Sequence, residues 1–194
     1  MDIRNFFFKY RSYTPIPIGL MMIFFARPNS THLTIGAISL FVGEFIRMWA
    51  VSYAGGVTRT RNVGAPLLCT SGPYAFVRNP LYVGNMMMYL GIVFIAGAAN
   101  VYLMAATTMA FFLIQYSLII SLEEETLQGL FETNYEEYKK NVPAIFPRLT
   151  PWKNTDKRKP QKILYTIKTE KRTLQNVALI LILIFLQTSF FKHN

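Results

Sequence analysis

The most suggestive polar residues of the sequence precede a proline that can open an apolar helix. Arg78 and Asn79 come directly before Pro80, and proline fits the first turn of a helix because its missing N–H is not needed there. Free N–H groups and the positive end of the helix dipole would favour an anionic or carboxylate group at this place. Alternatively, Tyr74, Arg78 and Tyr82 are only the side chains that anchor a helix at the head-group level of a membrane.

Three consecutive carboxylates, those of Glu123, Glu124 and Glu125, end a later apolar run. Negative charge at a helix C-terminus opposes the helix dipole, so the cluster needs an explanation. The carboxylates could bind a cation or a polyhydroxyl ligand. Alternatively, they could be a plain stop to an apolar helix, paired with nearby lysines.

A further pair of charges, Glu44 and Arg47, lies inside an apolar run. Residues three apart share one face of a helix, and charges at membrane depth are usually functional or paired with a partner. We therefore expect Glu44 and Arg47 to form a structural ion pair near the inner boundary of the membrane.

The composition restricts the class of protein and the kind of partner. Apolar residues make up 52% of the chain and charged residues 15%, whereas about a quarter of a soluble domain is charged. The net charge of +10 favours an acidic partner, and the long apolar runs indicate anionic lipid head groups instead of nucleic acid. Cys69 is the single cysteine, and His32 and His193 are far apart, so we expect neither a disulfide nor a metal site.

Five segments approach the length of about 20 mainly apolar residues that a helix needs to cross a bilayer. We therefore expect an all-α integral membrane protein with about five transmembrane helices, folded as a single domain over residues 1–194. The first segment is the shortest and is opened by Pro15 and Pro17. The expected spans are about 13–26, 33–54, 80–98, 101–122 and 174–191.

The basic residues predict how these spans lie in the membrane. With a cytoplasmic N-terminus, five spans place all but two of the 20 Lys and Arg residues on the inner side, where positive charge collects. The two exceptions are Arg27 and Lys192. The short uncharged turn Gly97–Asn100 should make the third and fourth spans an antiparallel hairpin. We thus expect the N-terminus and the 123–173 segment to be cytoplasmic.

Two motifs of the sequence, taken together, are similar to a known family. The first runs from Leu68 through Gly72-Pro73-Tyr74 to Arg78-Asn79-Pro80-x-Tyr82-x-Gly84. The second runs from Glu123-Glu124-x-x-Leu127 through Phe131, Tyr135 and Tyr138 to Val142-Pro143. Their order, spacing and apolar context resemble the isoprenylcysteine carboxyl methyltransferases. The resemblance covers residues 41–147 and includes Arg47-x-Trp49-Ala50.

The resemblance implies an activity, a cofactor and a site. Members of the family are membrane-integral and transfer a methyl group from S-adenosylmethionine to the C-terminal carboxylate of a prenylated cysteine, which leaves S-adenosylhomocysteine. By this resemblance the cofactor would occupy a polar pocket on the inner side, with Glu123 or Glu124 at its polar end. The residues carried over as its lining are Leu67, Leu68, Cys69, Tyr74, Asn79, Pro80 and Tyr82.

Two departures from the family pattern concern the site. Asn79 stands where the family has His, and Asn keeps hydrogen-bonding capacity but does not titrate. Eukaryotic members also place an Arg, thought to meet the substrate carboxylate, about a turn before the paired glutamates. This chain has Leu118-Ile119-Ile120 there. Since Arg can hold a carboxylate with two parallel hydrogen bonds, Arg47, Arg78 and Arg148 are the candidates for that role.

We expect no catalytic acid or base, because a carboxylate acceptor is already ionised at neutral pH. Alignment of the reactants and exclusion of water would then supply the catalysis. The expected partners are membrane lipids and a prenylated or other lipid-like acceptor. One alternative is a phospholipid or small-lipid methyltransferase, and another is a membrane reductase, against which the lack of a GxGxxG motif is weak evidence. A non-catalytic membrane scaffold or lipid-binding protein is the alternative of another class, but it has no need of two polar motifs that face one compartment.

Overall fold

The described part of the chain folds into helices. The computed structural model describes residues 2–55, 63–153 and 155–191, and these contain α-helices, a 3-10 turn and no strand. The prediction of an all-α fold is therefore confirmed. Arg59, Arg61 and Lys192, which entered the prediction of orientation, and His193 lie outside the described residues. The elements are α1 (Ile3–Tyr10), α2 (Ile16–Phe24), α3 (Ser30–Ala54), η2 (Gly72–Ala75), α4 (Pro80–Ala96), α5 (Val101–Asn141) and α6 (Ile163–Phe191).

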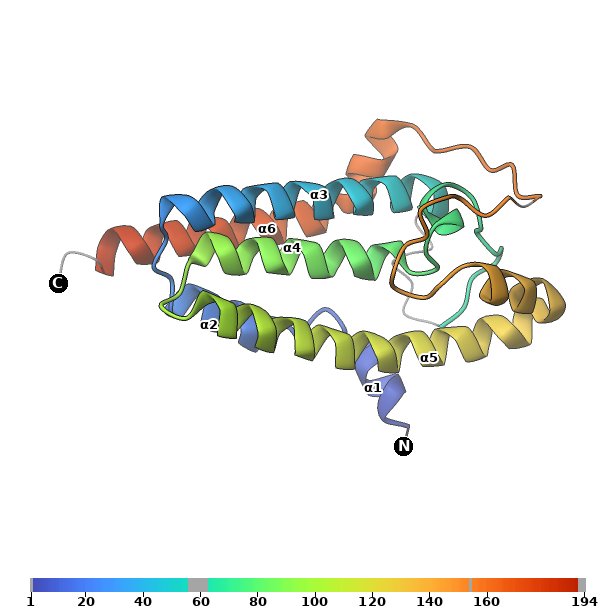
Figure 1. Ribbon diagram of the computed structural model, residues 1–194, viewed down its shortest axis with the longest axis horizontal. Coiled ribbons are helices and arrows are strands. Elements are labelled where there is room, and N and C mark those ends of the chain that lie inside the picture. The colour runs from blue at the N-terminus through green and yellow to red at the C-terminus, as the bar shows by residue number, and fades with distance from the viewer. Residues whose placement is uncertain (1, 56–62, 154, 192–194) are drawn as a thin grey trace.

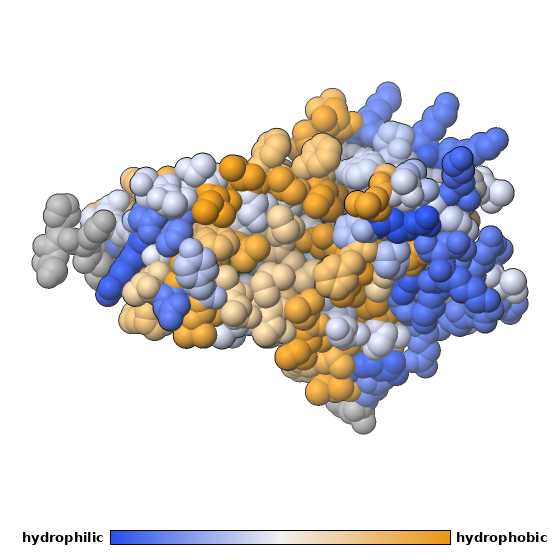
Figure 2. All heavy atoms as spheres, viewed as in Figure 1, coloured by the Kyte–Doolittle hydropathy of each residue, from blue (hydrophilic) through white to orange (hydrophobic). Residues whose placement is uncertain are grey.

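Within the described residues, three helices are long and apolar enough to cross a membrane, namely α3, α5 and α6. Helix α4 is apolar and shorter, with 17 residues. Figure 2 shows hydrophobic side chains around the middle of the elongated molecule and hydrophilic ones gathered at the end where α5 terminates. This distribution fits an integral membrane protein of about five helices, as predicted.

The first predicted span, residues 13–26, differs from the others. Its helical part is α2, which has nine residues and therefore a length of only about 14 Å. Helix α2 begins after Pro15 because the ring of proline restricts the backbone before a helix. The N-terminal chain instead follows the bundle in two pieces. Helix α1 contacts α5 near its polar end, and α2 packs against α4 and α6 towards the opposite end (Figure 1).

Glycines allow α3 and α4 to pack backbone to backbone. A Cβ atom added at Gly36 would lie 2.6 Å from the carbonyl oxygen of Gly91, and one at Gly43 would lie 2.7 Å from that of Gly84. Small residues permit such close approach between helices in a membrane. The pair runs side by side over most of its length (Figure 1), so it forms the rigid centre on which the site is built.

Helices α5 and α6 extend well beyond the predicted spans 101–122 and 174–191. Helix α5 continues past the three glutamates to Asn141 and bends at Glu132, where φ is 44° and ψ is −118°. The continuation includes Leu127–Lys140, for which the helical spacing of the apolar residues predicts a short helix of its own. Helix α6 begins at Ile163, so its first turns hold the last basic residues of the inner segment.

The described residues between α3 and α4 and those between α5 and α6 form one layer at the same end of the bundle, which we call the polar layer. The backbone N–H of Trp152 donates to Ala75 O at 2.8 Å, and that of Gln161 donates to Ser52 O at 2.7 Å. Arg148 is held in the same way by Phe76 O at 2.9 Å. Because the segment after α5 is hydrogen-bonded to the segment before α4, residues from both sequence motifs lie together at this end (Figure 1).

Candidate active site

The centre of the candidate site is the carboxylate of Glu123, which faces Tyr82 across the α4–α5 hairpin. Tyr82 Oη donates a 3.0 Å hydrogen bond to Glu123 Oε1. The Tyr82 ring also stacks on Tyr116, with 4.4 Å between centroids and 21° between planes. The short turn between α4 and α5 makes these helices neighbours. The hairpin thus brings together a carboxylate and aromatic faces, which suit a cationic ligand.

A string of buried polar contacts leads from this centre into the bundle. Asn85 Nδ2 donates to Tyr116 Oη at 3.0 Å, and Arg47 Nη1 donates to Asn85 Oδ1 at 2.5 Å. Arg47 Nη2 and Glu170 Oε2 form an ion pair at 2.5 Å, and Glu170 is only 1% exposed. The sequence did not show this partner of Arg47, and the predicted ion pair of Arg47 with Glu44 stays a prediction. Glu170 lies 123 residues after Arg47 in the chain, and the two residues meet because α6 packs against α3 in the folded protein.

The neighbouring carboxylate, Glu124, lies in an ion-pair cluster. Its Oε1 is 2.5 Å from Arg78 Nη2 and its Oε2 is 3.0 Å from Lys139 Nζ. Arg78 also donates to the carbonyl oxygens of Lys139 and Val142, which are orphaned at the end of α5. Glu124 and Arg78 therefore fasten the end of α5 to the start of α4. Their predicted contacts with cofactor or acceptor stay predictions.

Asn79 and Pro80 connect the start of α4 to the segment after α5. Asn79 Nδ2 donates to Ala144 O at 3.1 Å, and its backbone N–H donates to the same oxygen at 3.2 Å. Its side chain does not cap α4, whereas Pro80 is buried in the first turn. An amide suffices for this bridge, so the structure gives Asn79 a role that needs no titrating ring.

The residues predicted from the first motif divide by exposure. Leu67 is 68% exposed and lies outside the packed region, whereas Leu68 packs against Tyr138 and its neighbours. Burial raises the pKa of the Cys69 thiol, so Cys69 stays protonated near neutral pH. Tyr138 Oη donates to Tyr74 O at 2.8 Å, and the charge of Glu123 acts on the Tyr74 phenol.

Two residues beside the first motif were missed from the sequence. Asp156 Oδ2 accepts the backbone N–H of Thr70 at 3.0 Å, and Arg158 Nη2 donates to Leu68 O at 3.1 Å. Burial opposes ionisation of Asp156, but the N–H groups of Thr70 and Arg158 outweigh it and lower the pKa of that carboxyl. These residues belong to a polar stretch without periodicity, so no sequence signal assigns them to the site.

A third residue missed from the sequence is Arg11, which lies in the turn after α1. Its guanidinium lies 4.2 Å from the Phe8 ring centroid and donates to Phe8 O at 2.8 Å. Phe8 is buried in one cluster with Tyr116, against which Tyr82 packs. The charge of Arg11 acts on Glu123 and on Tyr82. An arginine of the N-terminal segment therefore lies beside the candidate site.

The remaining predicted arginine, Arg148, lies at the surface of the polar layer. Its Nη1 donates to Asn141 O at 2.6 Å in an exposed hydrogen bond. Of the residues predicted for the cofactor, Tyr82 contacts Glu123 directly, and Tyr74 interacts electrostatically with Glu123 and Cys69. Leu67 and Arg148 lie away from this centre.

The sequence is similar to a family of methyltransferases and to several curated proteins. The family model described as phospholipid methyltransferase matches residues 31–134. The cobalt-zinc-cadmium resistance protein CzcN of Cupriavidus metallidurans is 34% identical over 119 residues, 61% of this chain and 50% of that protein. Protein-S-isoprenylcysteine O-methyltransferase of Schizosaccharomyces pombe is 31% identical over 125 residues, 61% of this chain and 50% of that protein.

A third relative has another acceptor in its name. Methanethiol S-methyltransferase 2 of Bradyrhizobium diazoefficiens is 30% identical over 130 residues, 67% of this chain and 44% of that protein. The chain spans about half the length of the curated relatives it matches. No solved structure matches it.

Proposed function

Because the chain belongs to the phospholipid methyltransferase family, we propose that it transfers a methyl group from S-adenosylmethionine to the C-terminal carboxylate of a prenylated cysteine or a similar lipid-like acceptor. The observation that carries this proposal is that a carboxylate and a guanidinium lie against one cluster of aromatic rings, in which Tyr82 stacks on Tyr116. Glu123 contacts Tyr82, and Arg11 lies on the side of Phe8, whose cluster contains Tyr116. A cationic donor and an anionic acceptor need such neighbouring subsites.

The residues of the first subsite fit the donor. When bound, S-adenosylmethionine supplies a methyl group carried by a sulfonium cation and leaves as S-adenosylhomocysteine. Glu123 offers a carboxylate and Tyr82 and Tyr116 offer ring faces, all of which attract a cation. Cys69 and Tyr74 adjoin them as neutral groups. Trp152 covers this end of the molecule by stacking on Tyr138 at 5.8 Å, which helps to exclude water.

The second subsite concerns the acceptor carboxylate. Arg47 and Arg78 are each paired with a buried or nearly buried glutamate, and losing either partner would leave a charge uncompensated. Arg11 donates to the Phe8 carbonyl oxygen and rests on the Phe8 ring, so its guanidinium is held beside the aromatic cluster that contains Tyr116. We therefore add Arg11 to the three arginines predicted from the sequence as a group that can hold the carboxylate.

The function is tested by radiolabelled methyl transfer from S-adenosylmethionine in detergent or lipid discs. The acceptors are a farnesylcysteine and a geranylgeranylcysteine analogue, phosphatidylethanolamine and a small thiol. We expect transfer to a prenylcysteine analogue and its loss when the analogue's carboxylate is amidated. Labelling of the amine lipid or the thiol alone would replace the acceptor by the phospholipid or small-molecule alternative, and no labelling of any acceptor would favour a non-catalytic lipid-binding protein.

The Glu123→Gln variant tests the donor subsite. Because a hydrogen bond or contact to a charged group contributes ~1.5–3 kcal/mol, the Kd for S-adenosylmethionine should rise roughly tenfold to a hundredfold in calorimetry. Binding of neutral-sulfur S-adenosylhomocysteine separates two roles: an equal loss assigns Glu123 to the cofactor's amino group, and a smaller loss assigns it to the sulfonium. The control is Glu125→Gln, because this substitution removes the same charge from an exposed position. An unchanged Kd in folded Glu123→Gln would remove Glu123 from the site.

The Arg11→Gln variant tests the acceptor subsite. Loss of a charge-assisted contact to the carboxylate should lower kcat/KM for the prenylcysteine analogue by roughly tenfold to a hundredfold, with the Kd of S-adenosylmethionine unchanged. Arg11→Lys should recover only part, since Lys cannot copy the two parallel bonds. Arg4→Gln, which removes the same charge from α1 just before Arg11 and from a residue paired with Glu125, is the control. Wild-type kinetics in Arg11→Gln would leave Arg47, Arg78 and Arg148 as the candidates.

We also propose that the polar layer faces the cytoplasm. The support is the excess of basic residues in the 123–173 segment, which the positive-inside rule assigns to that side. Donor and acceptor chemistry would then be cytoplasmic. Cysteine labelling at position 157 by a reagent that cannot cross the membrane decides the matter, because labelling from outside contradicts this orientation.

A further inference from the structure

Helix α6 has two faces of different character. Thr166 and Glu170 are 2% and 1% exposed, and they lie on the face that turns towards α3 through the Arg47–Glu170 ion pair. The opposite side of the helix forms an open hollow with a volume of about 510 Å³. We call this hollow the α6 groove, and it is lined by Leu164, Ile167, Lys168, Lys171, Leu174, Gln175 and Ala178.

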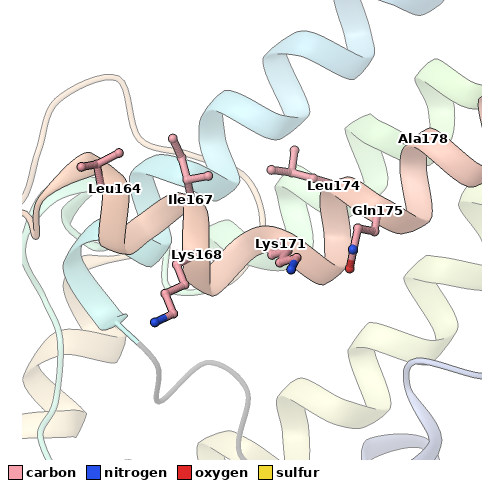
Figure 3. A pocket seen from close by; sticks show the side chains of 7 residues that line it. All are labelled: Leu164, Ile167, Lys168, Lys171, Leu174, Gln175 and Ala178. Carbon is pink, nitrogen blue, oxygen red and sulfur yellow. The ribbon is translucent and has the colours of Figure 1, made fainter.

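The side chains of the α6 groove are arranged as an apolar edge and a polar edge. Figure 3 shows Leu164, Ile167 and Leu174 along one side of the helix, and the two lysines and Gln175 along the other. Leu164 is 78% exposed, Ile167 41% and Leu174 37%. Such apolar exposure beside charge needs a partner that presents both a hydrocarbon chain and an anionic group.

The position of the α6 groove in the chain gives its depth. Lys168 and Lys171 are the last lysines before the apolar run that ends α6, and Lys162 and Arg172 flank them. Basic residues immediately beside a membrane span interact with anionic lipid head groups, and the lysine stems can lie along apolar surface while the ammonium groups stay at the head-group level. The groove therefore spans the boundary where phosphate groups and acyl chains meet.

We propose that the α6 groove binds one anionic glycerophospholipid, with its phosphate at Lys168 and Lys171 and an acyl chain along Leu174 and Ala178. A second copy of this chain is a poorer occupant. A two-fold contact between identical grooves would oppose lysine to lysine, and like charges facing each other are unfavourable. A zwitterionic lipid offers the same chain, but its net charge is zero.

Native mass spectrometry of the whole protein with defined lipids tests this proposal. Phosphatidylglycerol and phosphatidylcholine with identical acyl chains are added in turn, and the lipids retained per protein are counted. We expect preferential retention of one phosphatidylglycerol. The variant Lys168→Gln/Lys171→Gln should lower its affinity roughly 25-fold, about fivefold for each lysine near the membrane surface.

Two further variants separate the α6 groove from the general positive field. Lys157→Gln/Lys159→Gln removes the same charge from exposed positions before α6 and should keep the phosphatidylglycerol bound. Ala178→Phe should displace the acyl chain and lower retention while all lysines remain. Size-exclusion profiles verify that each variant is folded. Equal retention of the two lipids, or equal losses in the two double-lysine variants, would overturn the proposal.

Discussion

The Glu170→Leu variant is expected to lose about 3–5 kcal/mol in free energy of unfolding, because it leaves Arg47 as an uncompensated buried charge. Arg47 is 8% exposed and donates to Glu170 through Nε at 3.1 Å and Nη2 at 2.5 Å. Only 10% of the Arg47 side chain is exposed, so water replaces the carboxylate poorly. Unfolding in mixed SDS micelles, followed by circular dichroism, measures the loss.

The double variant Arg47→Met/Glu170→Leu tests whether the loss comes from the unpaired charge. Replacing both partners by apolar side chains removes the charge together with its counterpart, so most of the stability should return. Asn85 would still lose its 2.5 Å bond from Arg47, which limits the recovery. If the double variant is as unstable as Glu170→Leu, the defect lies in packing between α3 and α6 and the ion-pair explanation fails.

The Gly91→Val variant should prevent α3 and α4 from packing. A Cβ atom at Gly91 would lie 2.6 Å from Leu40 N and 2.7 Å from Gly36 O. Both are backbone atoms, which cannot move aside as the end of a side chain can. Overpacking a core usually costs ~1–3 kcal/mol, and this variant should reach or exceed the upper limit. Gly91→Ala should be milder but still destabilised.

The matched control is Gly129→Ala in α5. No atom lies within 4 Å of a Cβ added there, and alanine favours a helix over glycine by up to ~1 kcal/mol. Gly129→Ala should therefore equal or exceed the wild type in thermal stability in detergent. Normal yield and stability of Gly91→Val would show that α3 and α4 separate readily, contrary to the glycine contacts.

Much of the fold could be predicted from the sequence because membranes impose simple rules. Long apolar runs predicted the helices, and Pro80 marked the start of α4. The glutamate cluster marked the end of an apolar run but not the end of a helix. The sequence did not show that α5 continues past Glu123, because three carboxylates in a row are typical of the end of an apolar helix and the next helical pattern could belong to a separate helix. It also did not show that Ile3–Tyr10 forms a helix of its own, because α1 is stabilised by its contacts with α5.

The candidate site could be predicted only where its residues belong to motifs. Tyr82 and Glu123 were found because their spacing is recognisable, and the α4–α5 turn brings them together. Asp156 and Glu170 were missed, since each meets its partner across a long stretch of chain, and Arg11 was missed because it belongs to neither motif. Local sequence cannot say which of several charged residues will be neighbours after folding.

The string of contacts from Glu123 to Glu170 has a consequence for how ligand affinity and bundle stability depend on each other. Asn85 joins Tyr116 to Arg47, and Tyr116 stacks on Tyr82. A ligand that orders Tyr82 would therefore also favour the paired state of Arg47. By thermodynamic reciprocity, whatever tightens α6 against α3 must strengthen that ligand's binding by the same factor. Coupling free energies between Glu123 and Glu170 should then differ from zero, although the two carboxylates lie on helices that meet through other elements.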